Sequence, residues 1–209
     1  MLEQGACVLS DAELIAILLR NGTKGKDAIS LSRELLHTFA GLRGLFSAGP
    51  EELQKVRGLG RAKSAALAAA MEIARRQLRE EIVGKNIIRD PESVVHYLTL
   101  AMRDQKREVF KALFLNKANR ILAERDLFHG TVDSSAVHPR EVVKAALDHH
   151  ATAVIFVHNH PSGRVTPSPE DRHMTQTLKA ALETVSVKVL DHLIIGDNQH
   201  FSFCEHGLL

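Results

Sequence analysis

Residues 158–171 read HNHPSGRVTPSPED, and three side chains in this stretch are suited to holding a metal: His158, His160 and Asp171. The run before it, residues 153–157, is short, apolar and rich in β-branched and aromatic residues, which predicts a buried strand. His158 and His160 are two residues apart, so at the end of a strand their side chains project to the same side. Ser168 fits the N-cap of a helix whose first turn contains Asp171. A strand end, a loop and a helix start can therefore bring two imidazoles and a carboxylate together.

These three side chains form a ligand set that suits zinc. Zinc binds nitrogen and oxygen ligands in a tetrahedral array, and a catalytic site uses three protein ligands and leaves the fourth position to water. Bound water then ionises near neutral pH and becomes a nucleophile. Simpler interpretations remain open at this point, because Asp171 can serve only a capping box, and His158 and His160 can be ordinary loop histidines. Their joint position at a strand end favours the metal site.

The spacing His-x-His, seven residues, Ser, two residues, Asp resembles the JAMM signature of the MPN+/JAB metallopeptidases. The flanks, residues 158–163 and 166–168, are similar to those of RadC proteins, a bacterial branch long labelled as DNA repair factors. The resemblance implies an MPN fold, a zinc ion held by His158, His160 and Asp171, and hydrolysis of peptide or isopeptide bonds. It departs at Asn159, where eukaryotic deubiquitinating members carry Ser or Thr, and this weakens the case for a ubiquitin-like substrate.

The family mechanism also needs a general base that does not bind the metal, a Glu at the start of an early strand. Glu108 stands at the matching place, directly before the apolar run 109–115. The resemblance implies that Glu108 takes a proton from water and passes it to the leaving amine. It also implies that Ser168 hydrogen-bonds the developing oxyanion. From the residues alone, Glu108 can equally be an exposed acid at a strand end, and Ser168 can simply cap a helix.

Other histidines keep the ligand assignment open. Three of them are alternative ligands: His138, His173 and His192. The pair Asp191-His192, at a predicted strand end, can instead act behind a ligand and orient it.

Composition limits the class of protein. The 209 residues are 44% hydrophobic and 25% charged, which is ordinary for a soluble globular protein of one or two domains. The net charge is only +2, so basic character has to be local. Cys7 and Cys204 lie far apart and form no metal motif, which favours a reducing compartment. Apolar runs stay short of the roughly 18 residues of a membrane span, and no signal peptide is recognisable, so we expect a cytoplasmic protein with no membrane partner.

Residues 1–84 are predicted to form a small all-α domain. A capping-box pattern starts a helix at Ser10, a second amphipathic helix covers residues 27–39, and Pro50 opens a short third helix. Residues 41–50 between them are predicted to be a turn-rich connection. The polar stretch 79–86 is predicted to be the linker to the next domain.

Residues 53–67 resemble a helix-hairpin-helix motif. Gly58 and Gly60 separate an apolar segment from an Ala-rich one, and small residues let a phosphate approach the free N–H groups of a helix start. Residues 57–79 hold a surplus of basic side chains against one acid, Glu72. These are Arg57, Arg61, Lys63, Arg75, Arg76 and Arg79. We therefore expect Gly58, Gly60, Arg61 and Lys63 to contact the DNA backbone without reading sequence, although an ordinary helical hairpin with a solvated basic face is the simpler alternative.

Residues 85–209 are predicted to form a second domain with an α/β fold. Helices are expected from Asp90 to Met102, from Ser134 or Ser135 to about His150, and over 168–184. Strands are expected over 108–115, 120–126, 153–157, 187–195 (as one strand or a pair) and 200–203, with 128–133 continuing in extended form. A mixed sheet flanked by helices follows, which is the MPN/JAB-like sandwich that the resemblance implies.

Three functions are compatible with these features. The first is a zinc-dependent peptide or isopeptide hydrolase with a DNA-binding helical domain, linked to DNA repair. The second is a DNA-binding repair or scaffold protein whose metal domain is only structural. The third, a metal-dependent nuclease, fits less well, because many nucleases use paired metals and this set holds one. The sequence favours the first.

Overall fold

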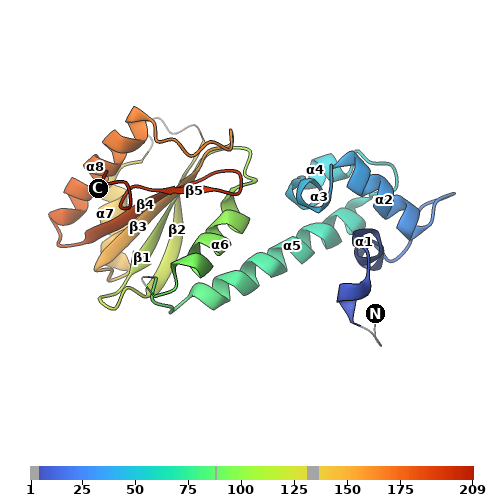
Figure 1. The fold of residues 1–209 in the computed structure, drawn as a ribbon, viewed down its shortest axis with the longest axis horizontal. Helices are drawn as coiled ribbons and strands as arrows, with labels where there is room; N and C mark the ends of the chain where they lie inside the picture. Colours follow the sequence, from blue (N-terminus) through green and yellow to red (C-terminus); the bar gives the residue numbers. More distant parts are fainter. Residues whose placement is uncertain (1–4, 88, 131–136) are drawn as a thin grey trace. The chain divides into compact units, whose positions relative to one another are not determined.

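The structure is a computed structural model that describes residues 5–87, 89–130 and 137–209. The chain forms two compact units, Met1–Arg76 and Gln77–Leu209, each with its own core (Figure 1). The division falls inside helix α5 (Arg61–Ile82), earlier in the chain than the predicted boundary between 84 and 85. The linker prediction over 79–86 is wrong as far as Ile82, because Arg, Glu and Ile continue a helix readily and Ile82 is buried in the core of the second unit.

The first unit is helical. Its elements are η1 (Ala6–Val8), α1 (Asp11–Leu19), α2 (Ala28–Thr38), α3 (Leu42–Ser47), α4 (Pro50–Leu53) and the start of α5. The predicted capping box is confirmed, because Ser10 and Glu13 form it at the start of α1. At the start of α2, the Asp27 side chain accepts from the backbone N–H of Ser30. The turn-rich prediction for 41–50 is wrong, because α3 forms there to bury Leu45 completely.

The second unit contains a five-stranded mixed sheet in the order β2-β1-β3-β4-β5. The strands are β1 (Val109–Leu115), β2 (Ile121–His129), β3 (Ala153–Asn159), β4 (Lys188–Ile195) and β5 (His200–Ser202). β3 and β4 run parallel, and the other neighbours are antiparallel. β3 is the middle strand, and all its residues are buried. The predicted α/β class with a mixed sheet is confirmed.

Helices cover both faces of this sheet (Figure 1). α6 (Pro91–Met102) packs on the face that carries Leu113, Ile155 and Val157. α7 (Pro139–Asp148) and α8 (Pro169–Glu183) pack on the opposite face, which carries Phe110, Phe114 and Phe156. Because side chains alternate along a strand, His158 continues the α8-covered face of β3, and Asn159 continues the α6-covered face. This alternation sets the positions of both residues.

The remaining predicted elements agree with the structure in type. β4 is one strand rather than a pair, and α7 starts at Pro139 with His138 as its N-cap residue. The predicted extended segment beyond Gly130 and the helix start at Ser134 or Ser135 lie outside the described residues. Over the described parts of the chain, every helix is too short or too polar to cross a membrane.

Candidate metal centre

The two histidines of the central strand are held by the sheet. His158 is paired with Phe110 of β1 on one side and Ile194 of β4 on the other, and its side chain is completely buried. His160 follows the end of β3, and its backbone N–H donates to the carbonyl of Ile195 at 3.0 Å, which extends the pairing with β4. The Nε2 atoms of the two rings are 3.0 Å apart. The prediction that both side chains face the same side is therefore confirmed.

Asp171 reaches the same point from the first turn of α8. Its Oδ2 atom accepts from the Ser168 backbone N–H at 2.8 Å and from the Ser168 hydroxyl at 2.7 Å, and the Asp171 N–H donates back to Ser168 Oγ at 3.1 Å. The capping-box interpretation is thus correct, yet it uses only one carboxylate oxygen. The other, Oδ1, lies 3.2 Å from His158 Nε2. One residue both starts the helix and faces the two imidazoles.

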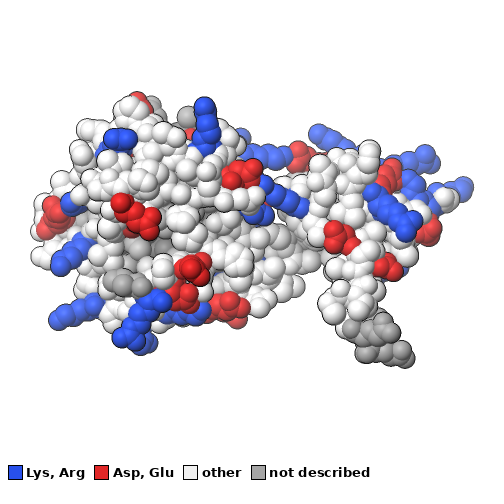
Figure 2. All heavy atoms as spheres, viewed as in Figure 1, with Lys and Arg blue, Asp and Glu red and all other residues white. Residues whose placement is uncertain are grey.

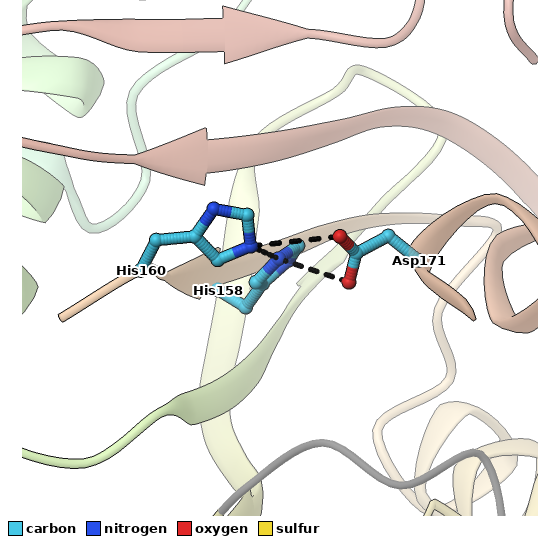
Figure 3. A group of neighbouring side chains, drawn as sticks. All are labelled: His158, His160 and Asp171. Atoms are coloured by element: carbon cyan, nitrogen blue, oxygen red, sulfur yellow. Dashed lines mark hydrogen bonds and ion pairs between the residues drawn. The ribbon is translucent and has the colours of Figure 1, made fainter. Parts of the chain in front are cut away.

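The spacing of these atoms suits a tetrahedral ion (Figure 3). Zinc–ligand bonds of about 2.0–2.1 Å give a tetrahedron whose edges are about 3.4 Å long. The measured separations are 3.0 Å between the Nε2 atoms, 3.2 Å from His158 Nε2 to Asp171 Oδ1, and 3.5 Å from His160 Nε2 to Asp171 Oδ2. Two imidazole nitrogens and a carboxylate are donor types that zinc accepts, and each nitrogen lies at about the length of a tetrahedral edge from a different oxygen of Asp171. The structure brings the three predicted ligands together.

Among the residues that the structure describes, these three side chains form the group that could hold a metal ion. The alternative ligands fall outside it. His173 is exposed on α8, and His138 is the exposed N-cap residue of α7. His192 is buried behind His158, where its Nε2 lies 2.8 Å from His158 Nδ1. It therefore contacts a ligand from the side away from the other two.

The charge state of the group favours a cation. Burial alone would raise the pKa of the Asp171 carboxyl, but the imidazoles of His158 and His160 beside it lower that pKa well below the ordinary value. The bond to Asp171 raises the pKa of His160 against the effect of burial, and the Arg164 carbonyl and the charge of Glu108 act in the same direction. A carbonyl oxygen can only accept, so His160 donates from Nδ1 to Arg164 at 2.7 Å and directs Nε2 to the site. The carboxylate is ionised, and it attracts positive charge.

A cavity of about 610 Å³ opens beside the group. Glu108, Ser168, His160 and Asp171 all line it, so the two predicted catalytic residues share one space with two of the predicted ligands. Glu108 is half-buried directly before β1 and close enough for its charge to raise the pKa of His160. This location favours the catalytic interpretation of Glu108 over that of an exposed strand-end acid.

Two further features of the site went unrecognised in the sequence. Asn159, between the histidines, is completely buried; its Oδ1 accepts from the Val109 N–H at 2.8 Å. The Asn159 Nδ2 group donates to the carbonyls of Gln105 and Arg107 at 3.3 and 3.2 Å. The side chain is therefore hydrogen-bonded to the backbone on both sides of Glu108. The available signal was a polar residue ending a buried strand, since such a group needs partners. Thr175, whose hydroxyl lies 2.6 Å from His192 Nδ1, gave no comparable signal.

The predicted DNA-contacting residues lie together where α4 leads into α5. Gly58 has a φ of 98°, a left-handed conformation that favours glycine, and Gly60 is exposed immediately before α5. Arg61 is exposed at the first position of that helix. Lys63 is partly buried, and its ammonium donates to the carbonyls of Gly22 and Gly58 at 2.6 and 3.2 Å, which gives it a structural task in the hairpin. Figure 2 shows basic side chains over this unit, with acidic ones among them.

The fold and the site together define a class: a mixed α/β domain with a His-x-His and Asp group, able to hold a metal, at the end of its central strand. Comparison with known families agrees. Residues 88–208 match the family described as RadC-like JAB domain, and residues 1–65 match the family described as UPF0758 N-terminal. The chain belongs to the RadC-like JAB family.

Full-length relatives share both parts. The chain is 49% identical over 209 residues to a UPF0758 protein of Nitrosomonas eutropha and to one of Nitrosospira multiformis, and 47% identical to one of a Polaromonas strain. Each alignment covers 100% of this chain and 93% of the relative. The predicted family resemblance is confirmed over the whole sequence.

Proposed function

We propose that the chain is a zinc-dependent hydrolase of peptide or isopeptide bonds. The observation that supports it most is the cavity in which Glu108 and Ser168 lie beside His160 and Asp171. His158, His160 and Asp171 would hold the ion. When bound, zinc supplies a water molecule of lowered pKa and polarises the carbonyl of the scissile bond.

The residues of the chain itself account for the proton transfers. The Glu108 carboxylate accepts the proton of the attacking water and passes it to the leaving nitrogen, as a base that does not bind the ion can. Ser168 donates its hydroxyl hydrogen to Asp171 Oδ2 in the present state. A rotation about the C–O bond redirects that hydrogen to the developing oxyanion, while the backbone N–H of Ser168 still holds Asp171 Oδ2.

A matched pair of variants tests this function. Glu108→Gln keeps the shape of the side chain but removes its basicity, and Glu170→Gln makes the same change at another acid that lines the same cavity. With zinc-loaded protein and a fluorogenic peptide library, Glu108→Gln should lose about 10²- to 10⁴-fold in rate and keep its zinc. Glu170→Gln should stay near the wild-type rate. Equal rates for wild type and Glu108→Gln, or cleavage of DNA in place of peptides, would overturn the proposal.

For the first unit we propose non-specific contact with the DNA backbone. The support is the exposed Gly60 and Arg61 at the start of α5, where helix N–H groups and a guanidinium can meet a phosphate. Binding to labelled duplexes should weaken steeply as salt rises and should be the same for unrelated sequences. Arg61→Ala should lower the affinity and the salt dependence, whereas binding that ignores salt would contradict the proposal. Both activities together suit the DNA repair role that the resemblance implies.

A further inference from the structure

We propose that Thr175 and His192 are positioning residues that fix the hydrogen of His158 on Nδ1 and so keep its Nε2 free for the metal. The inference rests on the proposed metal site, but it concerns the protein before any ion binds. It assigns a task to two residues from separate elements, α8 and β4. Neither belongs to the ligand group or lines the cavity beside it.

A continuous series of short hydrogen bonds joins these residues. The Thr175 hydroxyl lies 2.6 Å from the backbone carbonyl of Asp171 and 2.6 Å from His192 Nδ1. His192 Nε2 lies 2.8 Å from His158 Nδ1. The series therefore starts on the backbone of one proposed ligand and ends on the ring of another, and His158 Nε2 then faces the Asp171 carboxylate at 3.2 Å.

The Asp171 backbone carbonyl, at the start of this series, fixes which atom donates in every following hydrogen bond. The Asp171 carbonyl can only accept, so the single hydrogen of the Thr175 hydroxyl points to it. Thr175 Oγ1 can then only accept from His192, which places a hydrogen on His192 Nδ1. A neutral ring carries one such hydrogen, so His192 Nε2 is an acceptor and His158 must donate from Nδ1. The remaining nitrogen of a neutral His158, Nε2, keeps its lone pair and faces the ligand group.

The surroundings of His192 support a neutral ring. The residue is completely buried, and the rings of Phe203, Phe110 and Phe156 surround it, with centroids 4.7, 5.4 and 6.1 Å away. Burying a charge among apolar groups is costly, so a completely buried ring among three phenyl rings is favoured in its neutral form. The His192 ring therefore holds its hydrogen on Nδ1, toward Thr175, and accepts from His158 at Nε2. It adds no charge behind the proposed ion.

The helix offers an internal comparison for Thr175. Thr177, two residues later on α8, makes the same type of bond to the carbonyl four residues earlier, His173, at 2.9 Å. Thr177 is exposed, and its hydroxyl bond does not lead to the metal group. Thr177→Val therefore removes the helix bond alone, whereas Thr175→Val removes the helix bond and the acceptor for His192. Thr175→Ser keeps both.

Nitrogen-15 NMR of the histidine rings in the metal-free, full-length protein at slightly alkaline pH is the direct test. His192 and His158 should both show the tautomer with hydrogen on Nδ1. The opposite tautomer on either ring would overturn the proposal, and it would do so whether or not the protein hydrolyses peptides.

Zinc affinity provides a second readout, measured with zinc alone against a competing chelator. Thr175→Val should weaken zinc binding by about 10- to 100-fold, the usual effect of removing a partner behind a metal ligand. Thr175→Ser should restore most of the affinity, and Thr177→Val should match wild type. Equal affinities for Thr175→Val and Thr177→Val would contradict the positioning role. If Thr175→Val fails to fold, the wild-type tautomers and Thr175→Ser still decide the question.

Discussion

Asn159 offers the sharpest test of how the fold positions Glu108. Its side chain is completely buried and holds the backbone at Gln105, Arg107 and Val109 with three hydrogen bonds. The change Asn159→Ala removes these bonds without touching a proposed ligand or the proposed base. We expect a less stable second unit in which the segment carrying Glu108 is loosened.

The magnitude follows from the partners that are left behind. The Val109 N–H is buried and would lose its acceptor, which costs about 1–3 kcal/mol. The two carbonyls belong to exposed residues and can turn to water at a lower cost. The space of the lost amide adds to the loss, for a total of about 2–4 kcal/mol. In a unit of this size, each kcal/mol lowers the melting temperature by about 3 °C, so we expect a drop of roughly 6–12 °C.

Thermal unfolding followed by circular dichroism, together with peptide hydrolysis and zinc content, measures these effects. Zinc content should be unchanged below the transition, while hydrolysis falls because the base is no longer held. Asn116→Ala is a suitable control, because Asn116 also accepts from backbone N–H groups, those of Ala118 and Arg120, but in an exposed turn. A melting temperature for Asn159→Ala within a degree or two of the control, with normal hydrolysis, would show that Asn159 does not hold the segment that carries Glu108.

Three further outcomes are expected. Ser168→Ala should cost about 1 kcal/mol of stability through the lost cap, keep zinc, and lower the hydrolysis rate by about 10²-fold; a rate equal to wild type would remove Ser168 from the mechanism. Zinc affinity should fall as the pH is lowered through the pKa of His160, which lies above the ordinary 6.5, because zinc needs the neutral ring. The stability of the metal-free protein should change with pH in the opposite direction. The contribution of the protonated His160 ring is fully present below pH 6.5 and is lost as the pH rises through the raised pKa of the folded protein. A chelator titration and a melting series from about pH 5 to 9 should therefore show opposite trends. Gly58→Ala should destabilise the first unit by about 1–3 kcal/mol, because φ is 98° and a Cβ would lie 3.0 Å from Thr23. Gly60→Ala should destabilise it less, because a Cβ at Gly60 would meet open space, and chemical denaturation of both variants measures the difference.

The parts of the site that could be predicted are those with local signals. His158 and His160 follow an apolar run at strand spacing, and Asp171 stands three residues after a helix cap, so their positions depend on short-range rules. The structure adds that Asp171 fills both of its possible roles: Oδ2 accepts the capping bonds and lies near His160, and Oδ1 faces His158.

The parts that could not be predicted depend on contacts between distant elements. Thr175 and His192 are seventeen residues apart and meet only because α8 packs over β4. Asn159 reaches back some fifty residues to Val109, and no spacing rule connects them. In β4, the polar pair Asp191-His192 left open whether the strand breaks there; it continues, because the Asp191 carboxylate accepts from Ser202 and Cys204 while His192 is bonded within the core.

Zinc content, measured by elemental analysis of purified full-length protein, is the direct test of the metal centre formed by His158, His160 and Asp171. We expect about one zinc per chain in wild type and in His173→Ala, whose exposed ring lies on α8 outside the ligand group. We expect almost no zinc in His160→Ala, which changes a partly exposed side chain, and almost none in the double variant His158→Ala, His160→Ala. Circular dichroism checks that each variant is folded. A folded double variant that retains a full equivalent of zinc would contradict the assignment of the metal centre and the hydrolytic function built on it.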